Sequence, residues 1–270
     1  MSLNFSVVLS VYLSDNAEFF DFAIKSLLNQ TKKPSEIIIV TDGPVSQEIK
    51  KILDIYKKNS LFQIIELSEN VGLSQSRKKA ISHCSNNVIA VMDSDDISVN
   101  DRFEKQISLI ESGKFEVVGG WIKEFQNTPN DGKKIRKTPT KYSEIKSFGK
   151  WRNPINHVTL MFTKEAYEFS GGYSTIRHSE DWDMISRMIM KGISITALPE
   201  VLVHVRAGND FIKRRRNLSQ FKGEINLFIR MYKIKYLNVF QLLGNIFIRV
   251  FLRALPAGIT KAIYSRFLRS

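Results

Sequence analysis

The sequence contains a single cysteine, Cys84, among 270 residues. One thiol excludes an intramolecular disulfide framework and any zinc site built on several thiolates, so a reducing compartment is expected. Long apolar runs are also missing. The longest apolar stretch near the C-terminus, residues 237–252, is interrupted by three amides and Arg249, whereas a spanning helix needs about 18 uninterrupted apolar residues. No secretory signal opens the chain, and we expect a soluble or peripheral protein.

Acidic residues are nearly absent from the last part of the chain. Residues 211–270 hold 13 Lys and Arg against one acid, Glu224, whereas residues 1–210 hold 27 basic and 26 acidic residues. The net charge of +13 therefore lies almost wholly in the tail. We predict one main domain over residues 1–210 and a basic, mostly helical tail over residues 211–270.

Apolar and basic residues interleave in this tail, which is typical of an amphipathic helix on an anionic bilayer. The alternative is a helical lid that packs on the domain and leaves its basic face in solvent. Binding of nucleic acid through the tail is a further hypothesis. The nearly neutral first 210 residues and the lack of a recognisable nucleic-acid motif argue against it.

Strand and helix patterns alternate through the first 110 residues. Strands are predicted over residues 5–12, 37–40, 62–67 and 88–92, and helices after Asn16 and over residues 46–58, 74–83 and 100–111. This order predicts an α/β fold with a mostly parallel central sheet. Further along, we predict strands over residues 117–125, 158–162, 193–198 and 201–205, a mobile loop over residues 127–141 and a helix over residues 179–190.

Three carboxylates follow the fourth predicted strand within four positions, in the segment Asp93-Ser94-Asp95-Asp96. Ligands bind beyond the carboxyl ends of strands in open α/β sheets. Asp93 and Asp95 are two positions apart, so in an extended chain they emerge on one side and can share a hard cation with phosphate oxygens. The alternative is a turn followed by a helix cap, and Asp96 is the candidate for the cap.

Other polar residues are placed to reach the same edge. Tyr12 and Asp42 end the first two strands, where a ring can pack on a base and a carboxylate can accept a hydrogen bond from a nucleoside. Alternatively, each is ordinary strand packing or the start of a turn. Gly72 precedes a helix that carries Arg77 one turn in, an arrangement that suits phosphate but also fits a plain helix start.

A second acidic cluster, Glu180-Asp181-Trp182-Asp183, begins a predicted helix. The helix dipole favours acids in a first turn, but three acids exceed what a cap requires. A carboxylate on a rigid helix start is a credible general base, with Trp182 as a wall for a sugar. Sequence alone leaves Glu180, Asp181 and Asp183 open as the base.

In combination these motifs resemble family 2 glycosyltransferases with the GT-A fold, in the bacterial branch that builds capsule, exopolysaccharide (amylovoran-type) and O-antigen chains. The resemblance covers roughly residues 4–206. The motifs that carry it are Ser10-Val11-Tyr12, Asp42-Gly43, Asn70-Val71-Gly72-Leu73 with Arg77, Asp93-Ser94-Asp95-Asp96 as the DXD motif, and Gly171-Gly172-Tyr173 followed by Glu180-Asp181.

The resemblance implies an inverting, metal-dependent transfer of a hexose or N-acetylhexosamine from a UDP-sugar to a lipid-linked saccharide. Asp181 would be the base, and Mn²⁺ or Mg²⁺ would lie on Asp95, shared with Asp93. The donor-binding residues it implies are Val11, Tyr12, Asp42, Gly72, Arg77, Asp93 and Ser94. The acceptor-binding residues it implies are Trp182, Glu180 and His157, the last from the segment Asn153-Pro154-Ile155-Asn156-His157.

Such an enzyme would be cytoplasmic and peripheral at the inner face of the cell membrane, with the tail on anionic lipid. Two other functions compete with this one. One is a basic membrane- or nucleic-acid-binding protein whose α/β domain is not catalytic. The other is a sugar-phosphate nucleotidylyltransferase, which the first strand disfavours because it lacks the glycine-rich basic loop for a triphosphate.

Overall fold

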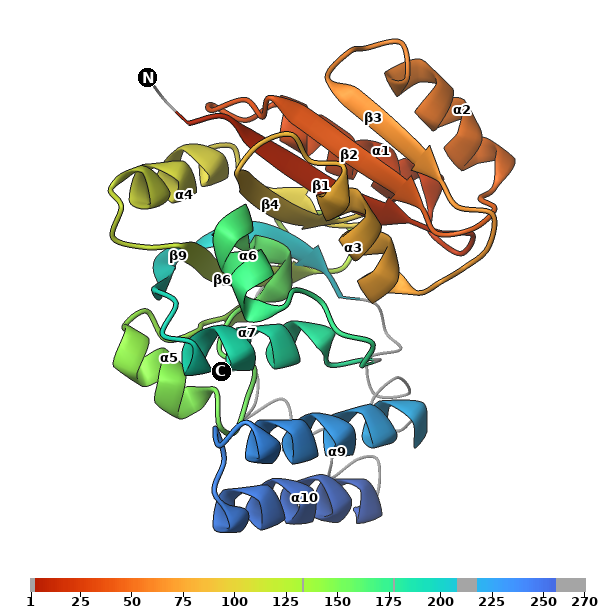
Figure 1. Ribbon diagram of the computed structural model, residues 1–270. Coiled ribbons are helices and arrows are strands. Elements are labelled where there is room, and N and C mark those ends of the chain that lie inside the picture. The colour runs from red at the N-terminus through yellow and green to blue at the C-terminus, as the bar shows by residue number, and fades with distance from the viewer. Residues whose placement is uncertain (1–2, 133, 177, 208–217, 256–270) are drawn as a thin grey trace.

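The computed structural model describes residues 3–132, 134–176, 178–207 and 218–255. These residues form a nine-stranded sheet in the order β3-β2-β1-β4-β8-β6-β9-β5, with β7 paired to β6 (Figure 1). The strands are β1 (Phe5–Val11), β2 (Glu36–Thr41), β3 (Phe62–Glu66), β4 (Val88–Asp93), β5 (Ile97–Ser98), β6 (Val117–Phe125), β7 (Lys134–Arg136), β8 (Met161–Thr163) and β9 (Ile195–Arg206). The helices are α1 (Ala17–Leu28), α2 (Gln47–Tyr56), α3 (Leu73–Ser82), α4 (Arg102–Glu111), α5 (Tyr142–Phe148), the 3₁₀ helix η1 (His157–Thr159), α6 (Lys164–Ser170), α7 (Glu180–Met190), α9 (Leu218–Lys233) and α10 (Val239–Ala254).

The first half has the predicted βαβαβαβ order. β3, β2, β1 and β4 are parallel neighbours, linked by α1, α2 and α3. Asn16 caps α1 as predicted, because its side chain accepts a hydrogen bond from the Phe19 N–H at 3.1 Å. The predicted α/β fold with a mostly parallel sheet is confirmed.

The second half differs from the prediction in its details. The two strands predicted around Pro199 are the single long strand β9, and Pro199 lies where a register shift interrupts the pairing with β6. Proline is tolerated at such bulges because the ladder hydrogen bond is already missing there. The loop predicted over residues 127–141 contains β7, and the strand predicted over residues 158–162 begins as η1 and extends only over β8.

The sheet buries both faces, with alternate strand residues in two cores. Val7 and Leu9 pack in the core that also contains residues of α1, α2 and α4. Val8 packs in the other core, together with residues of α3, α7 and α9. On this side α7, α9 and α10 are stacked outward in successive layers (Figure 1). The alternative of a lid packed on the domain therefore fits α9, whose Phe228 is fully buried.

Gln106 of α4 joins three parts of the fold. Its Nε2 donates to the Val118 carbonyl at 2.9 Å and to the Thr159 carbonyl at 2.7 Å, and its Oε1 accepts from the Arg102 Nε at 2.9 Å. We expect Gln106→Leu to lower the free energy of unfolding by about 3 kcal/mol or more, because it leaves buried polar groups without partners. Urea denaturation measures this change.

The matched control is Ser108→Leu, at an exposed position on the same helix, which should change the free energy of unfolding by less than about 0.5 kcal/mol. Equal effects of the two substitutions would contradict the role given to Gln106.

Candidate active site

The carboxyl ends of β1, β2 and β4 meet at one edge of the sheet. The register pairs Ser10 with Asp93 and Val11 with Thr41, so Tyr12, Asp42 and Asp93 emerge side by side, as the strand order predicts. Tyr12 is 44% exposed. This edge therefore offers an open aromatic face beside two carboxylates.

Asp42 holds the turn that precedes α3. Its Oδ1 accepts from the Val71 N–H at 2.7 Å and its Oδ2 from the Gly72 N–H at 3.1 Å. Gly72 has a φ of 88°, a conformation that glycine adopts without steric cost. Val11 has its side chain in the core and contributes only its carbonyl, which accepts from the Asp42 N–H at 2.8 Å.

Asp15, which was not predicted as a site residue, organises the loop after β1. Its Oδ2 accepts from the Ser94 hydroxyl at 2.8 Å and from the Tyr12 N–H at 3.1 Å. Burial and the nearby charge of Asp93 raise the pKa of Asp15, against the hydrogen bonds that lower it. The position of Asp15 four residues after a strand end was the available signal, because neighbouring strand ends share one edge.

Asp96 does not cap the helix that follows, contrary to the prediction. Asp101 precedes α4, and Asp96 is buried with its Oδ1 accepting from the Arg206 N–H at 2.8 Å. The Arg206 Nε donates to the Asp95 carbonyl at 3.3 Å, and its guanidinium lies 3.6 Å from the ring centroid of Phe19. The end of β9 thus fixes the acidic turn.

Like charges accumulate at this turn. Burial, followed by the charges of Asp93 and Asp15, raises the pKa of Asp95 to about 6. Burial and the charges of Asp93 and Asp95 raise the pKa of Asp96 well above its usual range. A bound cation would relieve this repulsion.

Arg77 joins the two acidic clusters. Its side chain is almost wholly buried, its Nη2 forms an ion pair with Asp93, and its Nη1 lies 3.9 Å from the Glu180 Oε1. Burial lowers the pKa of this guanidinium, but the surrounding charges of Asp93 and Glu180 outweigh burial and raise it. The start of α7 is therefore held against the end of β4.

Asp181 is fixed at the start of α7 by two hydrogen bonds. Its Oδ2 accepts from the Asn153 Nδ2 at 2.6 Å and its Oδ1 from the Trp182 N–H at 2.8 Å. Burial, followed by the charge of Glu180, raises the pKa of Asp181 to about 6. Asn153 was not predicted as a site residue, but the structure places its side-chain amide on Asp181.

Asp183 and Trp182 face the interior. Asp183 is 2% exposed and forms ion pairs with Arg187 at 2.9 Å and with Arg230 at 3.4 Å, so it serves α7 and α9 as a structural acid. The Trp182 Nε1 donates to the Gly149 carbonyl at 2.7 Å, and the ring packs edge-on against Phe228. The expected contact of Trp182 with an acceptor sugar does not fit this buried placement.

His157 lies in the interior, close enough to Arg77 to be affected by its charge. Its Nε2 is 2.6 Å from the hydroxyl of the buried Tyr173. Burial, followed by the charge of Arg77, holds the pKa of His157 well below its usual range. His157 is therefore a neutral member of a buried hydrogen bond, and this differs from the direct acceptor contact implied by the resemblance.

The described residues contain no group of three or more His, Cys, Asp or Glu side chains arranged to hold a metal. Asp93 and Asp95 supply oxygen ligands, which Mg²⁺ and Mn²⁺ prefer. Mg²⁺ is commonly held by one or two carboxylates together with substrate phosphates. Asp93 and Asp95 are two carboxylates that could hold a cation in this way.

The sequence model of glycosyl transferase family 2 matches residues 6–170. This chain belongs to glycosyltransferase family 2. An uncharacterized glycosyltransferase of Haemophilus influenzae is 35% identical and covers 99% of this chain and 100% of its own. The amylovoran biosynthesis glycosyltransferase AmsE of Erwinia amylovora is 31% identical over 97% of this chain and 98% of its own.

A third family 2 relative is the Escherichia coli UDP-Gal:alpha-D-GlcNAc-diphosphoundecaprenol beta-1,3-galactosyltransferase, which is 29% identical over 98% of this chain and 96% of its own. Among solved structures, Staphylococcus aureus TarS has a TM-score of 0.67 at 14% identity, covering 98% of this chain and 46% of its own. The mannosyltransferase PcManGT of Pyrobaculum calidifontis, in complex with GDP-Man and Mn²⁺, has a TM-score of 0.63 at 17% identity, covering 98% and 80%. These structures confirm the GT-A fold.

Proposed function

We propose that this family 2 glycosyltransferase moves a hexose or N-acetylhexosamine from a UDP-sugar to a lipid-linked saccharide in bacterial surface polysaccharide synthesis. The proposal depends mainly on the two interactions of Arg77. This side chain pairs with Asp93 at the donor edge and approaches Glu180, and it thereby holds the neighbouring Asp181 beside that edge. The name of the Escherichia coli relative, similar along nearly the whole chain, supports the donor and acceptor classes. The reaction takes place at the cytoplasmic face of the cell membrane.

The donor site uses the edge of β1, β2 and β4. The exposed Tyr12 ring packs on the uracil, and Asp42 both shapes the turn before α3 and accepts from the nucleoside. The Arg77 Nε is buried without a hydrogen-bond partner among the described residues, and an oxygen of the diphosphate would satisfy it. Ser94 stands between the acids of the DXD turn, anchored to Asp15.

Asp95 and Asp93 would hold Mn²⁺ or Mg²⁺ together with oxygens of the diphosphate. The raised pKa of Asp95, caused by burial and by neighbouring carboxylates, is the observation that fits a cation here. When bound, the metal supplies positive charge against the diphosphate, which makes it a better leaving group.

The protein residues perform the remaining steps. The Asp181 carboxylate takes the proton of an acceptor hydroxyl whose oxygen bonds to the anomeric carbon. The bond from that carbon to the diphosphate oxygen breaks, and the electron pair leaves with UDP beside the Arg77 charge. Attack from the face opposite the leaving group inverts the anomeric centre. Asn153 orients Asp181 for this transfer.

A panel of nucleotide sugars tests the proposal. The full-length protein is incubated with each donor and Mn²⁺ or Mg²⁺, with and without a lipid-diphosphate saccharide, and nucleotide release is measured. We expect release of UDP from one class of UDP-sugar, faster with the lipid-linked acceptor than with a free sugar. Release from a GDP-sugar alone, or transfer only to a water-soluble acceptor, would contradict the donor or the acceptor class.

A further inference from the structure

Helix α10 presents its apolar side outward. Phe240 is 80% exposed and Phe247 is 68% exposed. The other apolar side chains exposed on this helix are Val239, Leu243, Ile248, Val250 and Phe251. Their spacing of three and four residues places Phe240, Leu243, Phe247 and Phe251 on one long stripe. A surface helix of a soluble domain has the opposite arrangement, with its apolar stripe toward the core.

The polar side of α10 faces the protein. The Asn245 Nδ2 donates to the Lys150 carbonyl at 3.0 Å, and Arg253 and Arg249 lie 3.0 and 3.6 Å from Glu224 of α9. These contacts fix α10 at Asn245 against the segment after α5, and at Arg249 and Arg253 against α9. Helix α10 is the outermost layer of this part of the fold (Figure 1). We call its exposed apolar side the α10 face (Val239, Phe240, Leu243, Phe247, Val250 and Phe251).

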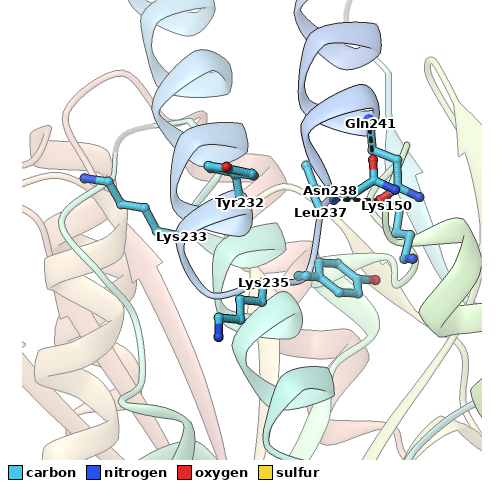
Figure 2. Close-up of a pocket in the computed structure, with 8 residues that line it drawn as sticks. Lys150, Tyr232, Lys233, Lys235, Leu237, Asn238 and Gln241 are labelled. Atoms are coloured by element: carbon cyan, nitrogen blue, oxygen red, sulfur yellow. Dashed lines mark hydrogen bonds between the residues drawn. The ribbon is translucent and has the colours of Figure 1, made fainter.

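Cationic side chains gather at the turn that leads into α10. A pocket of about 500 Å³ lies at the turn between α9 and α10, and Figure 2 shows Lys150, Lys233 and Lys235 around it with Tyr232 and the first turn of α10. No acidic side chain is among the described residues that line this pocket. The single acid of residues 218–255, Glu224, is paired with the two arginines of α10. The turn that leads into the α10 face is therefore positive.

We propose that the α10 face docks on an anionic lipid bilayer, with α10 lying flat and its phenylalanines among the acyl chains. An apolar stripe flanked by Lys and Tyr is what an anionic interface binds. No helix among the described residues is long and apolar enough to cross a membrane. This inference deepens the proposed function, because the docked enzyme reaches an acceptor held in the bilayer, but the docking itself requires no sugar transfer.

Vesicle flotation of the full-length protein tests the docking. Vesicles of phosphatidylcholine and phosphatidylglycerol in equal parts are compared with phosphatidylcholine alone. We expect Phe247→Glu to weaken binding to the anionic vesicles by about tenfold or more, because a charge replaces a phenylalanine that docking would bury in the bilayer. Lys233→Glu should weaken it by at least about fivefold and make binding to the two vesicle types more alike. The matched control, Ile55→Glu, alters an equally exposed apolar residue on α2 (65% exposed) and should bind like the unchanged protein.

Two further measurements separate the outcomes. Release of UDP from a UDP-sugar in the absence of lipid should be the same in Phe247→Glu as in the unchanged protein, so loss of docking is distinguishable from failure of the proposed chemistry. Light scattering gives the oligomeric state of Phe247→Glu and of the unchanged protein. The proposal is overturned if the unchanged protein does not float with anionic vesicles, if Ile55→Glu weakens binding as much as Phe247→Glu, or if Phe247→Glu converts a dimer to a monomer without affecting flotation.

Discussion

Asp181→Asn is expected to lower kcat for sugar transfer by about a hundredfold to ten-thousandfold, with little change in the KM for the donor. The asparagine keeps an oxygen that can accept from the Trp182 N–H or from Asn153, so the geometry of the α7 start is retained. It cannot take a proton from the acceptor hydroxyl, and general base catalysis is worth this range of rate. Initial rates at saturating donor and acceptor measure the change.

Glu180→Gln is the matched control, because it alters the neighbouring acid of the same helical turn. Glu180 lies 3.9 Å from the Arg77 Nη1, and its loss should affect donor binding more than kcat. A larger fall in kcat for Glu180→Gln than for Asp181→Asn would identify Glu180 as the base.

The pH dependence of kcat gives an independent check on Asp181. Burial and the charge of Glu180 raise the pKa of Asp181 to about 6, and a base acts only when deprotonated. We therefore expect kcat to rise as the pH increases through about 6 and to level off above it. Removing the like charge by Glu180→Gln should move this rise to lower pH. An unchanged rise in Asp181→Asn would assign the titration to another group.

The first half of the fold could be predicted from the sequence because its signals are local. Short β-branched runs alternate with helical periodicity, and Asn16 sits where a helix cap belongs. In the second half, α5 and α6 have seven residues each, and helices this short depend on tertiary packing more than on intrinsic propensity. Pro199 predicted a break in β9, whereas the bulge against β6 accommodates it.

The site could be predicted as far as strand ends define it. Tyr12, Asp42 and Asp93 follow from the shared edge of parallel strands. The interaction of Arg77 with Glu180 joins residues about a hundred positions apart, so no local sequence pattern predicts it. The side on which a helical residue faces is equally hidden, so Trp182 and Asp183, next to Asp181 in sequence, turn inward to Gly149 and to Arg187.

The tail shows why composition alone could not separate a lid from a membrane surface. The tail interleaves aromatic and basic residues throughout, yet its aromatic residues differ in burial. Phe228 of α9 is fully buried in the core, whereas Phe240 of α10 is 80% exposed. The two helices are joined through Glu224, which binds Arg249 and Arg253. The two alternatives drawn from the sequence thus apply to different helices, α9 as the lid and α10 as the proposed docking surface.

Asp95→Ala is expected to abolish metal-dependent transfer, with a loss of at least about a hundredfold, because positive charge on the leaving diphosphate is worth several kcal/mol. Asp95 lies at the turn between β4 and β5, and the charges of Asp93 and Asp15 act on its carboxylate more strongly than the opposing charge of Arg206. Calorimetric titration with UDP supplies a readout independent of turnover. Mn²⁺ should tighten UDP binding to the unchanged protein and leave it unchanged in Asp95→Ala.

Asp96→Asn separates the metal from a general effect of charge in the acidic turn. Asp96 is buried and accepts from the Arg206 N–H, a hydrogen bond that the asparagine oxygen can also accept. This variant removes a carboxyl group one residue away from Asp95, yet it should keep most of its turnover and the full effect of Mn²⁺ on UDP binding. If Asp95→Ala retained metal-dependent turnover, or if Asp96→Asn lost the effect of Mn²⁺ as completely, the metal could not be assigned to Asp95. Loss in Asp95→Ala alone would assign the cation to the Asp95 carboxylate.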